Sequence, residues 1–137
     1  MKRFLPVLLL FLAYSCAAQT SGDSLWSIWN NQHAIDSVRL KAIHTLAKKK
    51  TLYANPDSAF SLAAMQLHLA LSVGNHKYAG EALNTQGISW AVRGRLDSAM
   101  NYFHRALSEF EKGKLLSEMA GALYNSANTK GLFRIKK

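Results

Sequence analysis

The sequence predicts an all-α fold made of antiparallel helix pairs that repeat about every 40 residues. The tripeptide Asp-Ser-Ala begins at Asp57 and again at Asp97, and each copy opens a stretch whose apolar residues have helical spacing. The same offset of 40 relates Ala42, Ala82 and Ala122. A composition with 49% hydrophobic residues and only two prolines also favours packed helices. Self-similarity at one fixed offset predicts a stack of two-helix units.

Residues 1–18 have the order of a secretory signal peptide. Lys2 and Arg3 form a basic start, an apolar run of 11 residues follows, and small residues come next. The run is too short to span a bilayer, which takes roughly 20 apolar residues. Two interpretations remain open, namely cleavage after Ala18, which we prefer, and lipidation of Cys16. Because Cys16 is the only cysteine, neither interpretation leaves the mature chain a disulfide or a reactive thiol.

Residues 19–35 are expected to form an N-terminal cap on the first helix pair. Trp26 and Trp29 are three apart, so they lie on one face if this segment is helical. The terminal units of a repeat array need such a cover because their outer apolar side would otherwise face water. An aromatic platform for a ligand is the alternative interpretation of the two tryptophans.

The repeat region divides into three units, and the last one is expected to be incomplete. Within residues 36–137, the units lie at about 39–74, 79–114 and 119–137. The third unit has room for its first helix, expected over about 115–129, but not for a second. We therefore expect residues 130–137 to be frayed, and the open face of the third helix to favour self-association.

The middle unit shows the clearest helix signals. Its first helix is expected to run from about His76 to Val92 and to end at Gly94. Its second helix has Asp97 in the first turn, where a carboxylate satisfies free backbone N–H groups. Pro56 opens the equivalent helix one unit earlier, because proline suits the first turn of a helix.

The middle unit resembles the tetratricopeptide repeat (TPR) family. The positions at that family's spacing are Leu83, Gly87, Trp90, Gly94, Ala99, Phe103 and Ala106, and the small residues Ala47, Ala59 and Ala127 take corresponding places in the other units. Gly87 and Ala99 are expected to face each other, since two antiparallel helices approach closely only where small residues meet. The resemblance implies a TPR-like right-handed solenoid of about two and a half repeats, with a period of 40 rather than 34 residues.

A second resemblance covers about residues 25–128. The phrases DSVRLKAIHTLA, NPDSAF and ALNTQGISW look like the exported N-terminal repeat region of large bacterial sensor proteins. In those families the repeats precede a membrane helix and a histidine kinase, nucleotide cyclase or helix-turn-helix output domain. This resemblance implies export to the periplasm or cell envelope of a Gram-negative bacterium. It also implies an alternative function, as the truncated sensory region of a membrane signalling protein.

The sequence holds no motif for catalysis. It lacks a phosphate-cradling glycine loop, a His-Glu-x-x-His pair and a nucleophile elbow, and its five histidines lack metal-ligand spacing. The net charge is +9, but the basic residues are dispersed and no aromatic stacking motif accompanies them. We therefore expect no enzyme activity, cofactor, metal or nucleic-acid partner. Membrane attachment is expected only through a missing C-terminal part or through a lipid on Cys16.

The expected function is a non-enzymatic scaffold that binds a protein or peptide. If the helices stack as in the family, the first helices of the units line a concave groove, and their exposed positions meet the partner. These positions are Lys41, His44, Lys48, Glu81, Asn84, Ile88, Tyr124 and Asn128. This mixed, weakly basic surface suits an extended peptide, with plain solvated surface as the alternative.

Overall fold

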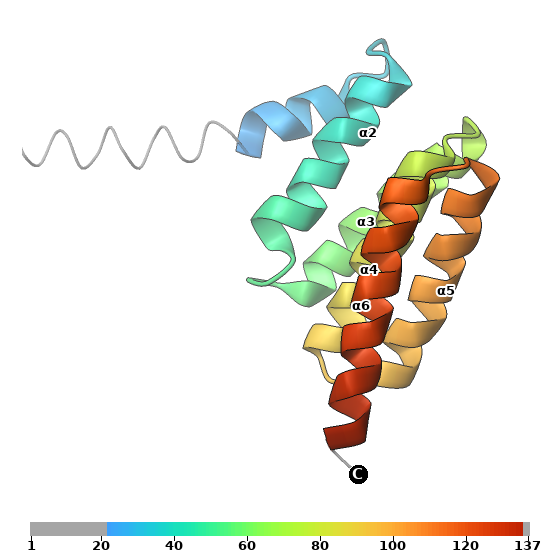
Figure 1. Ribbon diagram of the computed structural model, residues 1–137. Helices are drawn as coiled ribbons and strands as arrows, with labels where there is room; N and C mark the ends of the chain where they lie inside the picture. The colour runs from blue at the N-terminus through green and yellow to red at the C-terminus, as the bar shows by residue number, and fades with distance from the viewer. Residues whose placement is uncertain (1–21, 136–137) are drawn as a thin grey trace, which may run out of the picture.

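The computed structural model describes residues 22–135, and this part of the chain is helical almost throughout (Figure 1). A short helix over residues 22–30 comes first. The elements that follow are α2 (Asp36–Thr45), the π-helix η1 (Leu46–Thr51), α3 (Pro56–Ser72), α4 (His76–Val92), α5 (Leu96–Lys112) and α6 (Leu116–Ile135). No strand occurs among the described residues, and the predicted all-α class is confirmed. The predicted signal peptide, with Cys16 and Ala18, lies outside the described residues.

The 40-residue period consists of two modules of 20 residues. The helices α3, α4 and α5 each have 17 residues, and three residues separate each of them from the next helix. The middle residue of each turn has a positive φ, of 66° at Gly74, 76° at Gly94 and 57° at Lys114. The next residue then donates its N–H to the carbonyl five positions back, as from Arg95 to Trp90 at 2.9 Å. This is the Schellman ending that a left-handed residue allows.

Local chemistry explains where these helices begin. The side chain of Asn55 accepts a hydrogen bond from the N–H of Ser58 at 3.0 Å, and Asn75 does the same for Tyr78 at 3.1 Å. Each bond satisfies one of the free N–H groups of a first turn. The predicted helix start at Pro56 is confirmed.

The helix boundaries expected in the middle unit are also confirmed. The first helix of the middle unit runs from His76 to Val92, and Gly94 with its positive φ follows its end. Asp97 lies in the first turn of α5.

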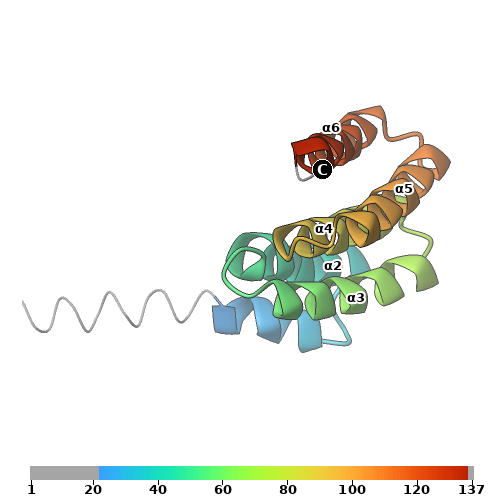
Figure 2. The same cartoon turned by 90° about the horizontal axis from the view of Figure 1, so that it is seen from below.

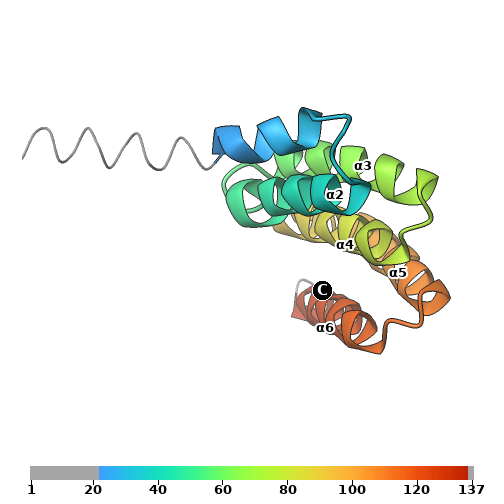
Figure 3. The same cartoon turned by 90° about the horizontal axis from the view of Figure 1, so that it is seen from above.

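The helices pack in chain order into a curved stack. Each helix packs against the one before it, while α4 also contacts α2 and α6. Figures 2 and 3 show α3 and α5 on the outer side of the curve and α2, α4 and α6 on its inner side. Two antiparallel pairs, α2 with α3 and α4 with α5, therefore place alternate helices on one common face.

The structure changes the expected partner of Gly87. A Cβ placed on Gly87 would lie 2.6 Å from the ring of Phe103, and the nearest atoms all belong to that ring rather than to Ala99. The glycine therefore makes room for an aromatic ring, which was not expected, while the facing of Gly87 and Ala99 stays a prediction. Gly80 plays the same part towards the ring of Phe110, and the sequence analysis missed it.

The other repeat positions divide by burial. Ala47, Ala59, Leu83, Gly87, Ala99, Phe103 and Ala106 are buried, Trp90 is half-buried and Ala127 is exposed. The first two units therefore bury their repeat positions between paired helices. On α6 the corresponding position is open to solvent.

Two helices differ from their expected course. α6 continues to Ile135, so the expectation that this helix ends near residue 129 was wrong. No proline interrupts this stretch, and a single glycine lowers helix stability by only about 1 kcal/mol. The first helix of the first unit is not α-helical to its end, because it widens into η1. The wide turns leave Leu52 only 2% exposed, whereas Val92, forty residues later, is 47% exposed.

Glu109 ties α5 to the start of α4. Its carboxylate lies 3.0 Å from Nδ1 of His76 and accepts a hydrogen bond from Nζ of Lys112 at 2.6 Å. Burial alone would raise the pKa of Glu109, but the hydrogen bonds from Lys112 and His76 outweigh it and lower that pKa below its usual 4.5. The ionised carboxylate therefore stabilises the fold.

We expect Glu109→Gln to lower the free energy of unfolding by about 1–3 kcal/mol at neutral pH. Because the pKa of Glu109 is depressed in the folded state, its contribution is present above about pH 4.5 and is lost as the pH falls through the folded value. Urea unfolding of both proteins at pH 7 and pH 3.5 should show the difference shrinking at the lower pH. Glu111→Gln, an exposed position on the same helix, serves as the control. A difference that is equal at both pH values would contradict this account.

Candidate binding groove

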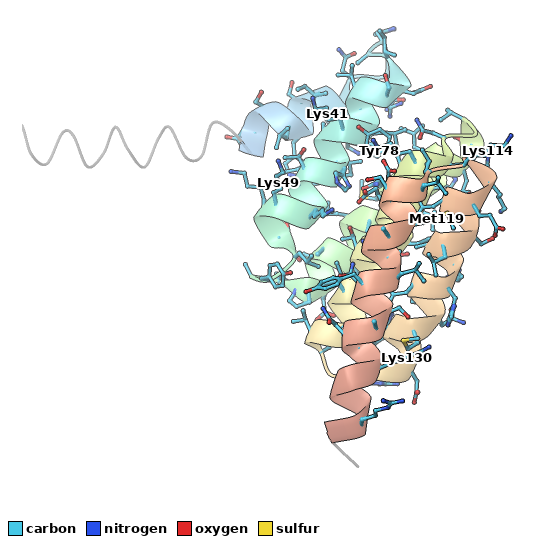
Figure 4. The ribbon with its side chains drawn as sticks, in the orientation of Figure 1. Lys41, Lys49, Tyr78, Lys114, Met119 and Lys130 are labelled. Atoms are coloured by element: carbon cyan, nitrogen blue, oxygen red, sulfur yellow. The ribbon has the colours of Figure 1, made fainter. Side chains whose placement is uncertain are left out.

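The inner face of the stack brings together three helices that are far apart in sequence. Each carries members of the predicted groove set: Lys41 and His44 on α2 with Lys48 on η1, then Glu81, Asn84 and Ile88 on α4, then Tyr124 and Asn128 on α6. Figure 4 shows Lys41 and Lys49 along the first of these helices and Tyr78 on α4 beside it. The face is therefore built from the first helix of each unit.

A polar cluster joins α2 and η1 to α4. Nζ of Lys48 lies 3.2 Å from Oε2 of Glu81, and Nε2 of His44 lies 3.9 Å from the same oxygen. The side chains of His44 and Glu81 are each only 18% exposed. The ring of Tyr78 meets the ring of His44 edge-on, with 5.9 Å between centroids. These contacts fix one wall of the groove, so His44, Lys48 and Glu81 interact with one another.

His44 has an unusual environment for a histidine. Burial lowers the pKa of His44, and Lys48 and Lys49 lower it further, while Glu81 opposes them without reversing the shift. Nδ1 of His44 and Oε1 of Gln66 are buried without a hydrogen-bond partner among the described residues. Because the pKa of His44 lies below its usual range, the ring is neutral at physiological pH. The groove wall therefore carries its positive charge on lysines.

A second set of contacts joins α4 to α6. Nδ2 of Asn125 donates a hydrogen bond to Oδ1 of Asn84 at 3.0 Å. Nζ of Lys77 lies 3.1 Å from Glu118, and this hydrogen bond lowers the pKa of the Glu118 carboxyl. Asn84 is only 7% exposed. It therefore holds two inner helices together, and its partner Asn125 was not among the predicted residues.

The remaining predicted residues stay accessible. Lys41, Tyr124 and Asn128 are exposed, Tyr124 to 67%, and Ile88 is half-buried. The exposed Lys49 adds a further positive charge at the same end as Lys41. The accessible part of the inner face thus offers cationic, aromatic, aliphatic and amide groups.

Trp29 and Trp26 have different surroundings at the N-terminal end. Trp29 is buried in a cluster with Ile43 and Leu46, whereas Trp26 is 37% exposed. Trp29 also lines a cavity of about 530 Å³ together with Arg39, Met65 and His68. Trp29 covers the apolar side of the first helix pair, so its contacts fit a cap.

Within residues 22–135, no group of three or more His, Asp or Glu side chains is arranged to hold a metal ion. None of the helices in that described range is both long enough and apolar enough to cross a membrane.

The chain matches no protein-family model, and no curated protein or solved structure shows significant similarity to it.

Proposed function

We propose that this protein is a non-enzymatic scaffold of the tetratricopeptide type that binds an extended protein or peptide segment along its inner face. The observation that carries the proposal is the polar bridging across α2, η1, α4 and α6. Contacts such as Lys48 with Glu81 and Asn84 with Asn125 join these helices into one surface. A preformed surface loses little entropy on binding, which favours affinity.

The chemistry of the accessible residues favours an acidic segment. Lys41 and Lys49 are exposed at one end of the face, and Lys41 makes no ion pair with any described residue. The amide of Asn128 can donate to and accept from an extended peptide backbone, and Tyr124 offers a broad aromatic surface with a polar tip. The partner we propose is therefore an extended peptide with Asp or Glu towards the α2 end. The setting we propose is the cell envelope, on the strength of the N-terminal sequence.

Selection from a displayed library of random decapeptides tests this proposal. We expect the immobilised protein to enrich peptides with Asp or Glu, and Lys41→Glu to weaken a selected peptide about tenfold, or about 1.4 kcal/mol. The matched control is Arg105→Glu, an exposed charge reversal on the outer helix α5. Affinity measured by fluorescence anisotropy should fall for the first variant alone. Enrichment without acidic residues, or equal losses in both variants, would contradict the proposal.

A further inference from the structure

The outer face of α6 carries an apolar stripe that no described residue covers. Its members are Leu116, Ala120, Leu123 and Ala127, and all four are exposed, Leu116 to 78% and Leu123 to 54%. Their spacing of four, three and four residues places them along one side of the helix. The opposite side of α6 packs on the core, where Ala122 is fully buried.

The repeat shows what such a stripe receives. Forty residues earlier, the equivalents of Ala120, Leu123 and Ala127 are Gly80, Leu83 and Gly87 on α4. All three are buried there beneath α5, where Gly80 meets the ring of Phe110 and Gly87 meets that of Phe103. The order of these contacts makes α5 antiparallel to α4. The α6 stripe therefore occupies the positions that, on α4, lie beneath the antiparallel helix α5.

Residue size is complementary across the helix pair at the Gly80 position. The second unit sets Gly80 against Phe110, whereas the first unit has Leu40 and Ala70 at the equivalent places, in one core cluster and fully buried. At this position a small residue on one helix goes with a large one on its partner, whereas the first unit has buried alanines, Ala47 and Ala63, at the places of Gly87 and Phe103. Because Ala120 stands where α4 has glycine, its methyl group leaves less room than Gly80 does. The helix that fits α6 should carry leucine or methionine where α5 carries phenylalanine.

Charge favours an acidic partner over a second copy of this chain. Lys130 and Arg134 are exposed near the end of α6, where they line a cavity together with Asp97 and Met100 of α5. An antiparallel helix would begin there, as α5 begins beside the end of α4, and acidic residues suit a first turn. A second copy would instead bring a chain of net charge +9.

We propose that the α6 stripe is a docking site for an amphipathic helix of a partner protein. The helix lies antiparallel to α6, presents leucine or methionine at two positions seven residues apart, and has an acidic first turn. This site is separate from the inner groove, since its members lie on the side of α6 that corresponds to the α5-covered side of α4.

A labelled peptide tests the proposal directly. The probe is residues 96–112 of this chain with Phe103→Leu and Phe110→Leu, which keeps Asp97 in the first turn. We expect saturable binding by fluorescence anisotropy and a gain in peptide helicity. The unaltered peptide with two phenylalanines should bind about threefold more weakly or worse, and a version with two alanines weaker still.

Variants of the protein locate the binding site. We expect Leu123→Asp to weaken the Leu peptide about tenfold or more. The control is Leu71→Asp on α3, because Leu71 has the same exposed fraction, 54%, away from α6. If circular dichroism shows that Leu123→Asp is unfolded, Ala127→Glu at an exposed position replaces it. Lys41→Glu should leave this affinity unchanged, which separates the result from the groove proposal.

Three outcomes would overturn the inference. The first is no saturable binding of the Leu peptide. The second is equal weakening by Leu71→Asp and Leu123→Asp. The third is a protein dimer in sedimentation that Leu123→Asp dissociates while the peptide fails to bind, which would assign the stripe to a second copy.

Discussion

Replacing Gly80 by leucine is expected to remove most of the stability of the fold, and shortening Phe110 to alanine in the same chain is expected to cost less than it does in the wild type. The ring of Phe110 fills the space that a side chain at Gly80 would occupy, and the ring is only 1% exposed. We expect Gly80→Leu alone to lower the free energy of unfolding by about 3 kcal/mol or more, despite the better helix propensity of leucine. Phe110→Ala alone should lower it by about 3–5 kcal/mol, because it leaves a cavity.

The double variant is informative because the first unit already has leucine and alanine at the equivalent positions. Leu40 and Ala70 occupy the places of Gly80 and Phe110, and both are fully buried. We therefore expect the double variant to lose about 1–3 kcal/mol less free energy of unfolding than the two single losses added together. Urea unfolding followed by circular dichroism measures all four proteins of this cycle.

Gly121→Leu is the matched control. Gly121 is also a helical glycine, but a Cβ there would meet nothing within 4 Å. We expect this variant to be neutral or slightly more stable than the wild type, since leucine favours helix over glycine by about 0.8 kcal/mol. The packing argument fails if Gly80→Leu behaves like Gly121→Leu, or if the two single effects simply add in the double variant.

Local signals in the sequence predicted the helix boundaries well. Asn55 and Pro56 specify a helix start through capping and a fixed φ, and Gly94 specifies an end through its left-handed conformation. These effects act within a few residues, so they can be read from the sequence alone. The end of α6 was missed because it was placed by the repeat length, whereas no helix-breaking residue stands near residue 129.

Contacts between helices were harder to predict. The repeat register shows that position 87 is small, but the side chain that fills the space comes from another helix. Gly80 escaped notice because its counterpart forty residues earlier is Leu40, so the register shows no shared residue type. Complementary sizes across a pair become visible only when both helices are placed.

The groove shows the same limit. The predicted residues do lie on three neighbouring inner helices, but Asn84 accepts a hydrogen bond from Asn125, which is 41 rather than 40 residues away. Adjacent inner helices are offset from the repeat register, so a bridging pair does not occupy equivalent positions. The widening at η1, which directly precedes the buried Leu52, was not predicted either, because helical spacing carries no signal for it.

Trp29→Ala is expected to lower the free energy of unfolding by about 3–5 kcal/mol, while Trp26→Ala is expected to lower it by less than about 1 kcal/mol. Trp29 is 9% exposed and packs on Ile43 and Leu46, and the guanidinium of Arg39 lies 5.2 Å from the centre of its ring. Trp26 keeps more than a third of its surface in water. Thermal and urea unfolding of the two variants measure the difference.

Hydrogen exchange distinguishes a cap from a ligand platform. In a stack where each unit contacts mainly its neighbours, losing a terminal cover weakens the adjacent unit first. Trp29→Ala should therefore raise amide exchange in α2, around Ile43, well before it does so in α5. The alanine variant keeps the backbone carbonyl of residue 29, which accepts a hydrogen bond from Nε of Arg39 at 3.1 Å. Any loss of stability therefore reports on the ring itself. If both tryptophan variants unfold like the wild type and exchange in α2 is unchanged, the cap interpretation is wrong, and the two rings are available as a ligand platform.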